Sequence, residues 1–166
     1  MLDSPPECVL DTNVSIDFHR GELLEVLFAL PFDFLAPDVV VAELEVPDGQ
    51  ELLTLGLRSV SLSGEEVLEV LALADRHRRP SVNDLFALIL ARTRGATLLT
   101  GDRALRALAE AEGLEVHGSL WLLDALVRLK IATPWEASAG LNLMLAHGSR
   151  LPERECRLRI RRWRAQ

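Results

Sequence analysis

Four acidic residues stand at positions where a parallel α/β sheet would bring side chains together. Asp11 and Asp102 each come at the end of a short apolar run that is typical of a buried strand. Ligands of such sheets bind outside the carboxyl ends of the strands, so we expect these two carboxylates to face each other across a crevice. Asp84 lies in the first turn of an expected helix, and Glu43 lies on a helix that follows the second expected strand.

Four carboxylates cannot converge without a cation, because their mutual repulsion would raise their pKa values or push them apart. A hard divalent ion such as Mg²⁺ or Mn²⁺ prefers oxygen ligands and keeps several waters. Bound ions of this kind activate water and stabilise the negative charge that develops in phosphoryl transfer. The acidic residues therefore predict a metal-dependent hydrolase of phosphate esters.

Each acidic residue also has an interpretation that requires no chemistry. Asp11 and Asp102 could cap the helices that follow them, and Asp84 could be an acid that the helix dipole favours in a first turn. Glu43 could be a solvated helix residue, and Glu45 competes with it for the functional position. The four residues fit one pattern better than any of them does alone.

The elements that would position these residues alternate between strand and helix, which indicates an α/β domain with a mainly parallel sheet. Strands are expected at 7–11, 32–36, 58–62, 96–100 and 114–117. Helices are expected at 13–19, 22–30, 39–45, 50–57, 64–79, 84–94, 103–112, 120–130, 134–147 and 152–164. We expect residues 1–148 to form a nuclease domain with a helical end, and residues 149–166 to form an arginine-rich helix packed on the same domain.

The chain has 166 residues, which suits a single domain with a real core. No apolar run is long enough to span a bilayer, and the first residues lack the pattern of a signal peptide, so the cytoplasm is the expected location. Cys8 and Cys156 are distant in sequence and are expected to be free thiols.

The net charge of −7 is unevenly distributed. From Arg150 onward, seven arginines against Glu153 and Glu155 give a balance of +5, so residues 1–149 carry −12. Such an acidic body does not attract nucleic acid by its charge. Three alternatives remain: bound cations neutralise part of the acid, the basic tail supplies the attraction, or the partner is not nucleic acid.

The order and spacing of the acidic segments resemble those of the PIN-domain family, over about residues 7–117. The helical end is similar to an extension found in one prokaryotic branch of that family. The resemblance rests on these segments: Val9-Leu10-Asp11-Thr12-Asn13, Val41-Ala42-Glu43-Leu44, Asp84 with Ala87 and Ala91, and Leu98-Leu99-Thr100-Gly101-Asp102.

This resemblance implies a three-layer α/β/α fold with a parallel five-stranded sheet in the order 3-2-1-4-5. It implies a Mg²⁺- or Mn²⁺-dependent ribonuclease that acts on single-stranded RNA. Many small prokaryotic members are VapC-like toxins, each paired with a small antitoxin protein that blocks the acidic site.

Carried over by position, the resemblance assigns the metal carboxylates to Asp11, Glu43, Asp84 and Asp102. It assigns the hydrogen bonds that orient these carboxylates, or the waters of the ions, to Thr12, Asn13 and Thr100. Family members often have an aromatic residue shortly after the last acid, whereas this chain has Arg103-Ala104-Leu105. We therefore take Arg103 and Arg106 as the candidates for contacting RNA phosphates.

Two other functions are compatible with parts of the pattern. A non-catalytic binding module could keep the fold, although the intact set of acids argues against it. A phosphatase with an aspartate nucleophile could begin at Asp11, but Asn13 stands where such an enzyme usually needs a second aspartate, and Lys130 is badly placed for the lysine that it needs. The three tryptophans, Trp121, Trp135 and Trp163, all lie in the helical end, which could serve a homodimer or complete the core of a monomer.

Overall fold

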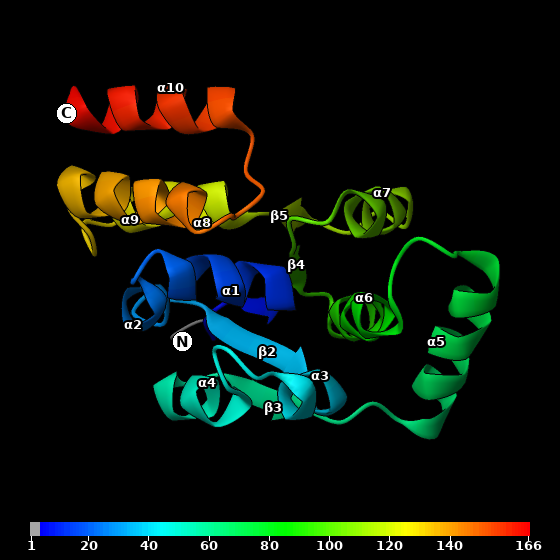
Figure 1. Ribbon diagram of the computed structural model, residues 1–166. Helices are drawn as coiled ribbons and strands as arrows, with labels where there is room; N and C mark the ends of the chain where they lie inside the picture. The colour runs from blue at the N-terminus through cyan, green and yellow to red at the C-terminus, as the bar shows by residue number, and fades with distance from the viewer. Residues whose placement is uncertain (1–3) are drawn as a thin grey trace.

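Residues 4–166, which the computed structural model describes, contain a five-stranded sheet. Every pair of neighbouring strands is parallel, and the order is β3-β2-β1-β4-β5 (Figure 1). The strands are β1 (Glu7–Leu10), β2 (Asp33–Pro37), β3 (Arg58–Val60), β4 (Thr97–Leu99) and β5 (Val116–His117). The chain crosses to the other side of β1 between β3 and β4, so the strand order reverses at the β1–β4 pair. The expected fold class and sheet order are confirmed.

Helices cover both faces of this sheet, which makes the three layers visible in Figure 1. One face packs against α1 (Thr12–Arg20), α2 (Leu24–Leu27), α8 (Ser119–Arg128) and α9 (Pro134–Ala146). The other face packs against α6 (Val82–Arg94) and α7 (Arg103–Ala111), with α5 (Gly64–Arg76) against α6. The remaining helices are α3 (Asp38–Glu43) and α4 (Gly49–Leu55) near β3, and α10 (Glu153–Arg164), which lies outside α8 and α9.

The two hydrophobic cores follow directly from the alternation of side chains along the strands. In β1, Cys8 and Leu10 point into the core beneath α1 and α8, whereas Val9 points into the core beneath α6. In β4, Leu99 points into the core beneath α1 and α8, whereas Leu98 points into the core beneath α6. Because both faces of the sheet are buried, the strands read as continuous apolar runs rather than as alternating ones.

Several expected helices end earlier than predicted, among them the one expected at 64–79, which ends at Arg76. The helix expected at 22–30 is reduced to α2, because Glu22 adopts a left-handed conformation with φ of 55° and α2 starts without a side-chain cap. The helix expected at 39–45 ends at Glu43, since Leu44 is extended and the backbone of Glu45 pairs with Asp48. In the described part of the chain, none of the helices combines the length and the apolar character that a bilayer crossing requires.

The helical end is joined to the sheet by one close approach of backbones. A Cβ atom at Gly140 of α9 would lie 3.1 Å from the carbonyl oxygen of Gly21, and one at Gly21 would lie 3.0 Å from the carbonyl oxygen of Gly140. Such contacts with backbone oxygens are tighter than most real Cβ contacts, so glycine at both positions favours this close packing of α9 on the end of α1. These two glycines therefore help to set the position of α9 relative to α1.

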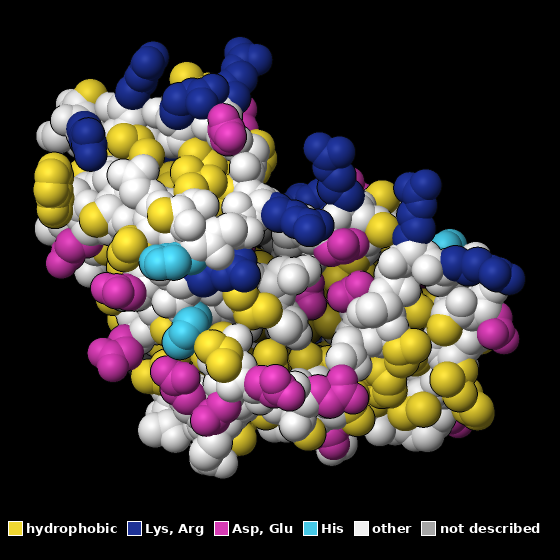
Figure 2. Space-filling view, in the orientation of Figure 1, with side chains coloured by type: hydrophobic (Ala, Val, Ile, Leu, Met, Phe, Trp, Pro, Cys, Tyr) yellow, Lys and Arg dark blue, Asp and Glu magenta, His cyan; other side chains and the backbone are white. Residues whose placement is uncertain are grey.

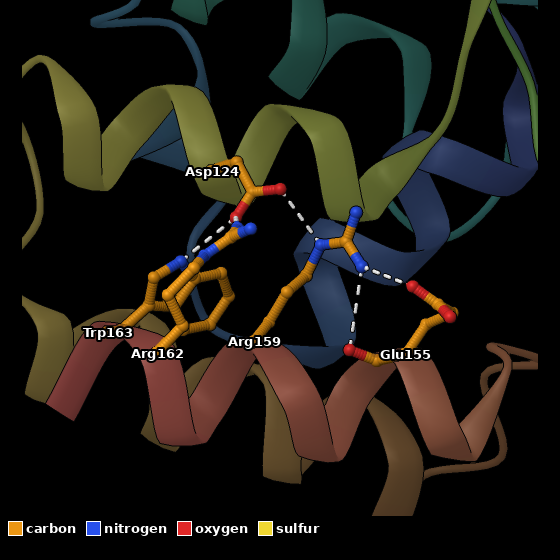
Figure 3. A network of polar contacts seen from close by, with 5 residues as sticks. All are labelled: Asp124, Glu155, Arg159, Arg162 and Trp163. Carbon is orange, nitrogen blue, oxygen red and sulfur yellow. Dashed lines mark hydrogen bonds and ion pairs between the residues drawn. The ribbon is translucent and has the colours of Figure 1, made fainter. Parts of the chain in front are cut away.

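The last helix is anchored through the carboxylate of Asp124 on α8 (Figure 3). Oδ1 of Asp124 accepts a hydrogen bond of 2.9 Å from Nε1 of Trp163, and Oδ2 accepts one of 2.8 Å from Nε of Arg159. Arg162 forms a third contact with the same carboxylate. Trp163 is 1 % exposed, so its indole is fully packed and its N–H is satisfied.

Candidate active site

Asp11 emerges from the carboxyl end of β1, the central strand, and is 4 % exposed. Its backbone N–H donates to the carbonyl of Leu99 at 3.0 Å, which extends the pairing of β1 with β4 by one residue. Its Oδ1 accepts from the backbone N–H of Thr12 at 2.8 Å, so Asp11 caps α1. The cap interpretation and the functional interpretation of Asp11 are therefore compatible.

Thr100 and Asp102 leave the end of β4 and meet Asp11 there. The buried hydroxyl of Thr100 donates to Oδ2 of Asp11 at 2.7 Å and accepts from the backbone N–H of Asp102 at 3.1 Å. Oδ1 of Asp102 in turn accepts from the N–H of Leu105 at 2.8 Å, so Asp102 caps α7. One hydroxyl thus links the two strand-end aspartates.

Asp84 approaches from α6, as the third residue of its first turn. Its Oδ2 accepts from the backbone N–H of Ser81 at 2.7 Å, and the Ser81 hydroxyl accepts from the N–H of Asp84 at 3.1 Å. This reciprocal capping box fixes the start of α6. The charge of Asp84 is close enough to Asp11 to raise its pKa.

Glu43 is the last residue of α3 and is exposed. Its Oε2 accepts from the side-chain amide of Asn83 at 2.7 Å, which joins it to the residue immediately before Asp84. Glu45 lies beyond the helix, in the turn whose backbone pairs with Asp48. The geometry therefore connects Glu43, rather than Glu45, to the start of α6.

Burial is the main reason that the pKa of Asp11 is raised to about 6. The hydrogen bond from Thr100 opposes this shift, and so does the one from the backbone of Thr12. The negative charges of Asp84 and Asp102 raise the pKa further. Asp11 is thus a carboxylate whose charge is not compensated by a nearby positive group.

The donor set suits a hard divalent cation, since Asp11, Glu43, Asp84 and Asp102 offer only oxygen. Within residues 4–166, no three acidic, histidine or cysteine side chains are close enough to hold an ion as they stand. The carboxylates of Asp84 and Asp102 are instead hydrogen-bonded to backbone N–H groups at the N-termini of their own helices.

The remaining expected site residues divide between the centre and its rim. Thr12 begins α1 and is half-buried, whereas Asn13 is exposed and lines a cleft together with Asp102 and Arg103. Arg106 does not face the cleft in this way. Its guanidinium donates to the carbonyls of Thr100 and Val116, each at 3.3 Å, so it braces the ends of β4 and β5.

This cleft, of about 670 Å³, contains residues that the sequence did not single out. Figure 2 shows a hollow with Asp and Glu side chains inside it and along its lower edge, and Lys and Arg side chains on its upper and right-hand rim. Asn13, Ile16, Asp17 and Arg20 line the cleft from one stripe of α1, with spacings of three and four residues. Asn13, Asp17 and Arg20 recur at spacings of four and three residues, and this spacing is a sequence pattern that could have placed Asp17 and Arg20 beside Asn13.

The protein is an α/β domain whose parallel sheet has the strand order 3-2-1-4-5. An acidic centre lies at the carboxyl edge of this sheet. This combination agrees with one family model. The model described as PIN domain matches residues 7–165, so the chain belongs to the PIN-domain family. PIN domains are generally nucleases and typically use divalent metal ions. No curated protein sequence matches the chain significantly.

Proposed function

We propose that this protein is a Mg²⁺- or Mn²⁺-dependent endoribonuclease that cleaves single-stranded RNA in the cytoplasm. The observation that carries the proposal is the electrostatic state of Asp11. Burial and two neighbouring carboxylates raise its pKa to about 6, in a centre made only of oxygen donors. Sites with such strongly perturbed carboxylates at the carboxyl edge of a sheet are typical of catalysis.

Asp11, Glu43, Asp84 and Asp102 would hold the metal. The ion, when bound, supplies water activation and stabilisation of negative charge on the phosphate. Thr100 fixes the orientation of Asp11, and Thr12 and Asn13 provide further hydrogen-bonding groups at the start of α1. Helices α1, α6 and α7 begin at this centre, and the positive ends of their dipoles favour a phosphate there. Hydrolysis would leave a 5′-phosphate and a 3′-hydroxyl, and no side chain needs to act as the nucleophile.

The direct test is cleavage of a 5′-labelled single-stranded RNA by the purified protein. We expect cleavage with Mn²⁺ or Mg²⁺, none with EDTA, and none by the Asp11→Asn variant, whose fold is checked by circular dichroism. Glu45→Gln serves as the matched control and should cleave like the unmodified protein. Cleavage that survives both EDTA and Asp11→Asn would show that the mechanism is wrong.

We propose further that the protein acts as the toxin of a toxin–antitoxin pair, as VapC-like members of the family do. Apolar side chains supply a surface for a partner: Leu68 and Leu71 of α5 are 66 % and 53 % exposed, and Val82 of α6 is 48 % exposed. Figure 2 shows hydrophobic side chains gathered over α5. Exposed apolar groups of this kind mark protein interfaces. A small antitoxin is the occupant that we propose, and a second copy of the chain is the alternative.

Expression of the chain alone in a bacterial host tests the toxin role. Growth should stop, and the Asp11→Asn variant should restore it at equal protein levels. Co-expression of the small protein encoded by a neighbouring gene should also restore growth, and Leu68→Ser with Leu71→Ser should weaken its binding. Unimpaired growth with active, soluble protein would exclude the toxin role while leaving the nuclease activity in place.

Residues 149–166 are proposed to work within the same domain as residues 1–148. The contacts of Trp163 and Arg159 with Asp124 support this proposal, since they tie α10 to α8. The family match, which extends to residue 165, supports it as well.

A further inference from the structure

The cleft beside the acidic centre has two walls that come from distant parts of the sequence. Arg20 lies on the wall formed by α1, and Arg150 lies on the wall formed by the turn between α9 and α10. Arg103, at the start of α7, lies where the cleft meets the acidic centre. Helix α9 packs against α1 where Gly140 approaches Gly21, and this packing places the second wall beside the first.

Among the residues that the structure describes, the arginines of the cleft form no ion pair, and the same is true of Arg76, Arg78, Arg79 and Arg128 in the sheet domain. By contrast, Arg58, Arg92, Arg94 and Arg106 each pair with a carboxylate. The chain has 25 acidic residues and a net charge of −7, so partners for arginine are abundant. Arg20, Arg103 and Arg150 line the cleft together with the carboxylates of Asp17 and Asp102, so guanidinium groups outnumber carboxylates there and favour an anion.

The acidic residue on the α1 stripe, Asp17, forms no ion pair with the cleft arginines within residues 4–166, although its charge stays beside the cleft. Oδ2 of Asp17 accepts the hydroxyl of Ser119 at 2.6 Å, and Asp17 is 8 % exposed. This bond ties α1 to the start of α8. Asp17 is thus a structural contact in the cleft wall, and the guanidinium of Arg20 remains available.

The guanidinium of Arg20 contacts the turn that precedes α10. Its Nη1 lies 3.5 Å from the hydroxyl of Ser149, a residue that is 7 % exposed and whose N–H donates to the carbonyl of Met144 at 2.9 Å. A guanidinium has five N–H donors, so this contact leaves donors free for the oxygens of a phosphate. Ser149 directly precedes Arg150, so the same turn brings both cations together.

The distance along α1 shows which phosphate this pair would bind. Arg20 lies two helical turns beyond Asn13, which is about 10 Å along the axis. A phosphate at Arg20 and Arg150 is therefore not the phosphate at the carboxylates, but one that belongs to a neighbouring nucleotide of the same strand. Arg103, which directly follows Asp102, lines the same cleft.

We propose that Arg20 and Arg150 form a phosphate-binding subsite for a nucleotide adjacent to the cleavage position, and this inference rests on the proposed nuclease function. In this arrangement the turn before α10 supplies half of the subsite. The helical end thereby takes part in binding the substrate, which explains how a protein of negative net charge binds RNA. The subsite orients the strand and takes no part in bond cleavage.

Binding of a labelled single-stranded RNA of twelve nucleotides to the Asp11→Asn variant tests the subsite without cleavage, and the unmodified protein in EDTA serves as a second form. Arg20→Gln and Arg150→Gln, each added to that background, should weaken binding roughly tenfold, as expected for loss of a charge-assisted hydrogen bond. The slope of log K against log salt should shrink by about 0.7 for each lost phosphate contact. Arg150→Lys should keep most of the slope.

The matched control is Arg154→Gln, which removes an exposed arginine at the start of α10 that does not line the cleft. This control should bind RNA like the parent. In the active protein with Mn²⁺, Arg150→Gln should raise KM and change kcat little, because the subsite binds substrate and transition state alike.

The outcomes separate the two proposals. Cleavage by the unmodified protein, together with unchanged affinity and salt slope in the Arg20→Gln/Arg150→Gln double variant, would overturn the subsite and leave the nuclease function standing. Arginine-dependent binding without any cleavage would overturn the nuclease function and support the subsite. Failure of both protein forms to bind RNA would overturn the subsite.

Discussion

The hydroxyl of Thr100 donates a hydrogen bond of 2.7 Å to Oδ2 of Asp11, and both groups are buried between neighbouring strands. The same hydroxyl accepts from the backbone N–H of Asp102. This contact makes the hydroxyl the link between the two halves of the acidic centre. It also predicts how the centre responds when the hydroxyl is removed.

Thr100→Val keeps the shape of the side chain and removes the donor, which leaves the buried carboxylate of Asp11 with one partner fewer. We expect the free energy of unfolding at pH 7 to fall by about 1–3 kcal/mol. Thr100→Ser, which retains the hydroxyl, should recover most of the loss. Urea denaturation monitored by circular dichroism measures both variants. Equal stability of the valine and serine variants would show that the hydrogen bond is not important.

The raised pKa of Asp11 predicts a pH dependence of stability in the metal-free protein. The pKa is about 6 in the folded state, above the ordinary value of 3.8, so the folded state binds the proton more tightly. Stability from this group is complete below pH 4 and is lost as pH rises toward 6. The shift corresponds to a loss on the order of 3 kcal/mol.

The Asp11→Asn variant isolates this effect, because it has no proton to lose at that position. In EDTA, the difference in unfolding free energy between the unmodified protein and the variant should change between pH 4 and pH 6 and then become constant. Relative to the unmodified protein, the variant should be more stable at pH 7 than it is at pH 4. A constant difference across pH 4–7 would contradict a raised pKa.

Metal binding should follow the same titration. A protonated Asp11 cannot serve as a ligand, so Mn²⁺ affinity should increase as pH rises through 6. Millimolar Mn²⁺ should therefore raise the midpoint of thermal unfolding more at pH 7.5 than at pH 5.5, because a ligand of the folded state stabilises it. Asp11→Asn should greatly reduce the shift at both pH values. A shift of equal size in this variant would place the ion elsewhere.

Glu43 and Glu45 form a matched pair for assigning the fourth carboxylate. Glu43 contacts Asn83 beside Asp84, whereas Glu45 lies in the turn after α3. We expect Glu43→Gln to lower kcat by tenfold or more, because losing a group that helps to stabilise the charge developing in the transition state has effects of this size. Glu45→Gln should leave kcat within about twofold. The reverse pattern would transfer the role to Glu45.

The anchor of α10 predicts a contrast between two acidic residues. Asp124→Ala leaves the indole N–H of Trp163 buried without an acceptor and also removes the partner of Arg159 and Arg162, so we expect a loss of about 2 kcal/mol or more. Glu155→Ala removes only an exposed ion pair with Arg159, one helical turn away. This change should lower the free energy of unfolding by about 0.5 kcal/mol. Thermal unfolding distinguishes the two, and similar costs would mean that the buried contact adds nothing.

The sheet and the strand-end aspartates could be predicted from sequence because their signals are local. Apolar runs mark β1 and β4, and an acid at the end of each run is placed at the carboxyl edge by the strand itself. Asp84 could be placed for a similar reason, since Ser81 and Asp84 form a capping box that defines where α6 begins.

The choice between Glu43 and Glu45 could not be made from the sequence. It depends on where α3 ends and on a contact with Asn83, which is 40 positions away. The cleft depends on a still longer contact, because Arg20 meets Ser149 across 129 positions. Periodicity within α1 indicates which face is polar, but it does not indicate which segment lies opposite.

Helix capping by the acidic residues has a consequence for how related chains should diverge. Asp11, Asp84 and Asp102 each satisfy backbone N–H groups at the start of a helix. Selection for folding alone would therefore retain them in a relative that no longer cuts RNA. Glu43 ends a helix, is exposed and caps nothing, so folding places no such demand on it. Among related chains, a change at Glu43 should be the first sign that catalysis has been abandoned.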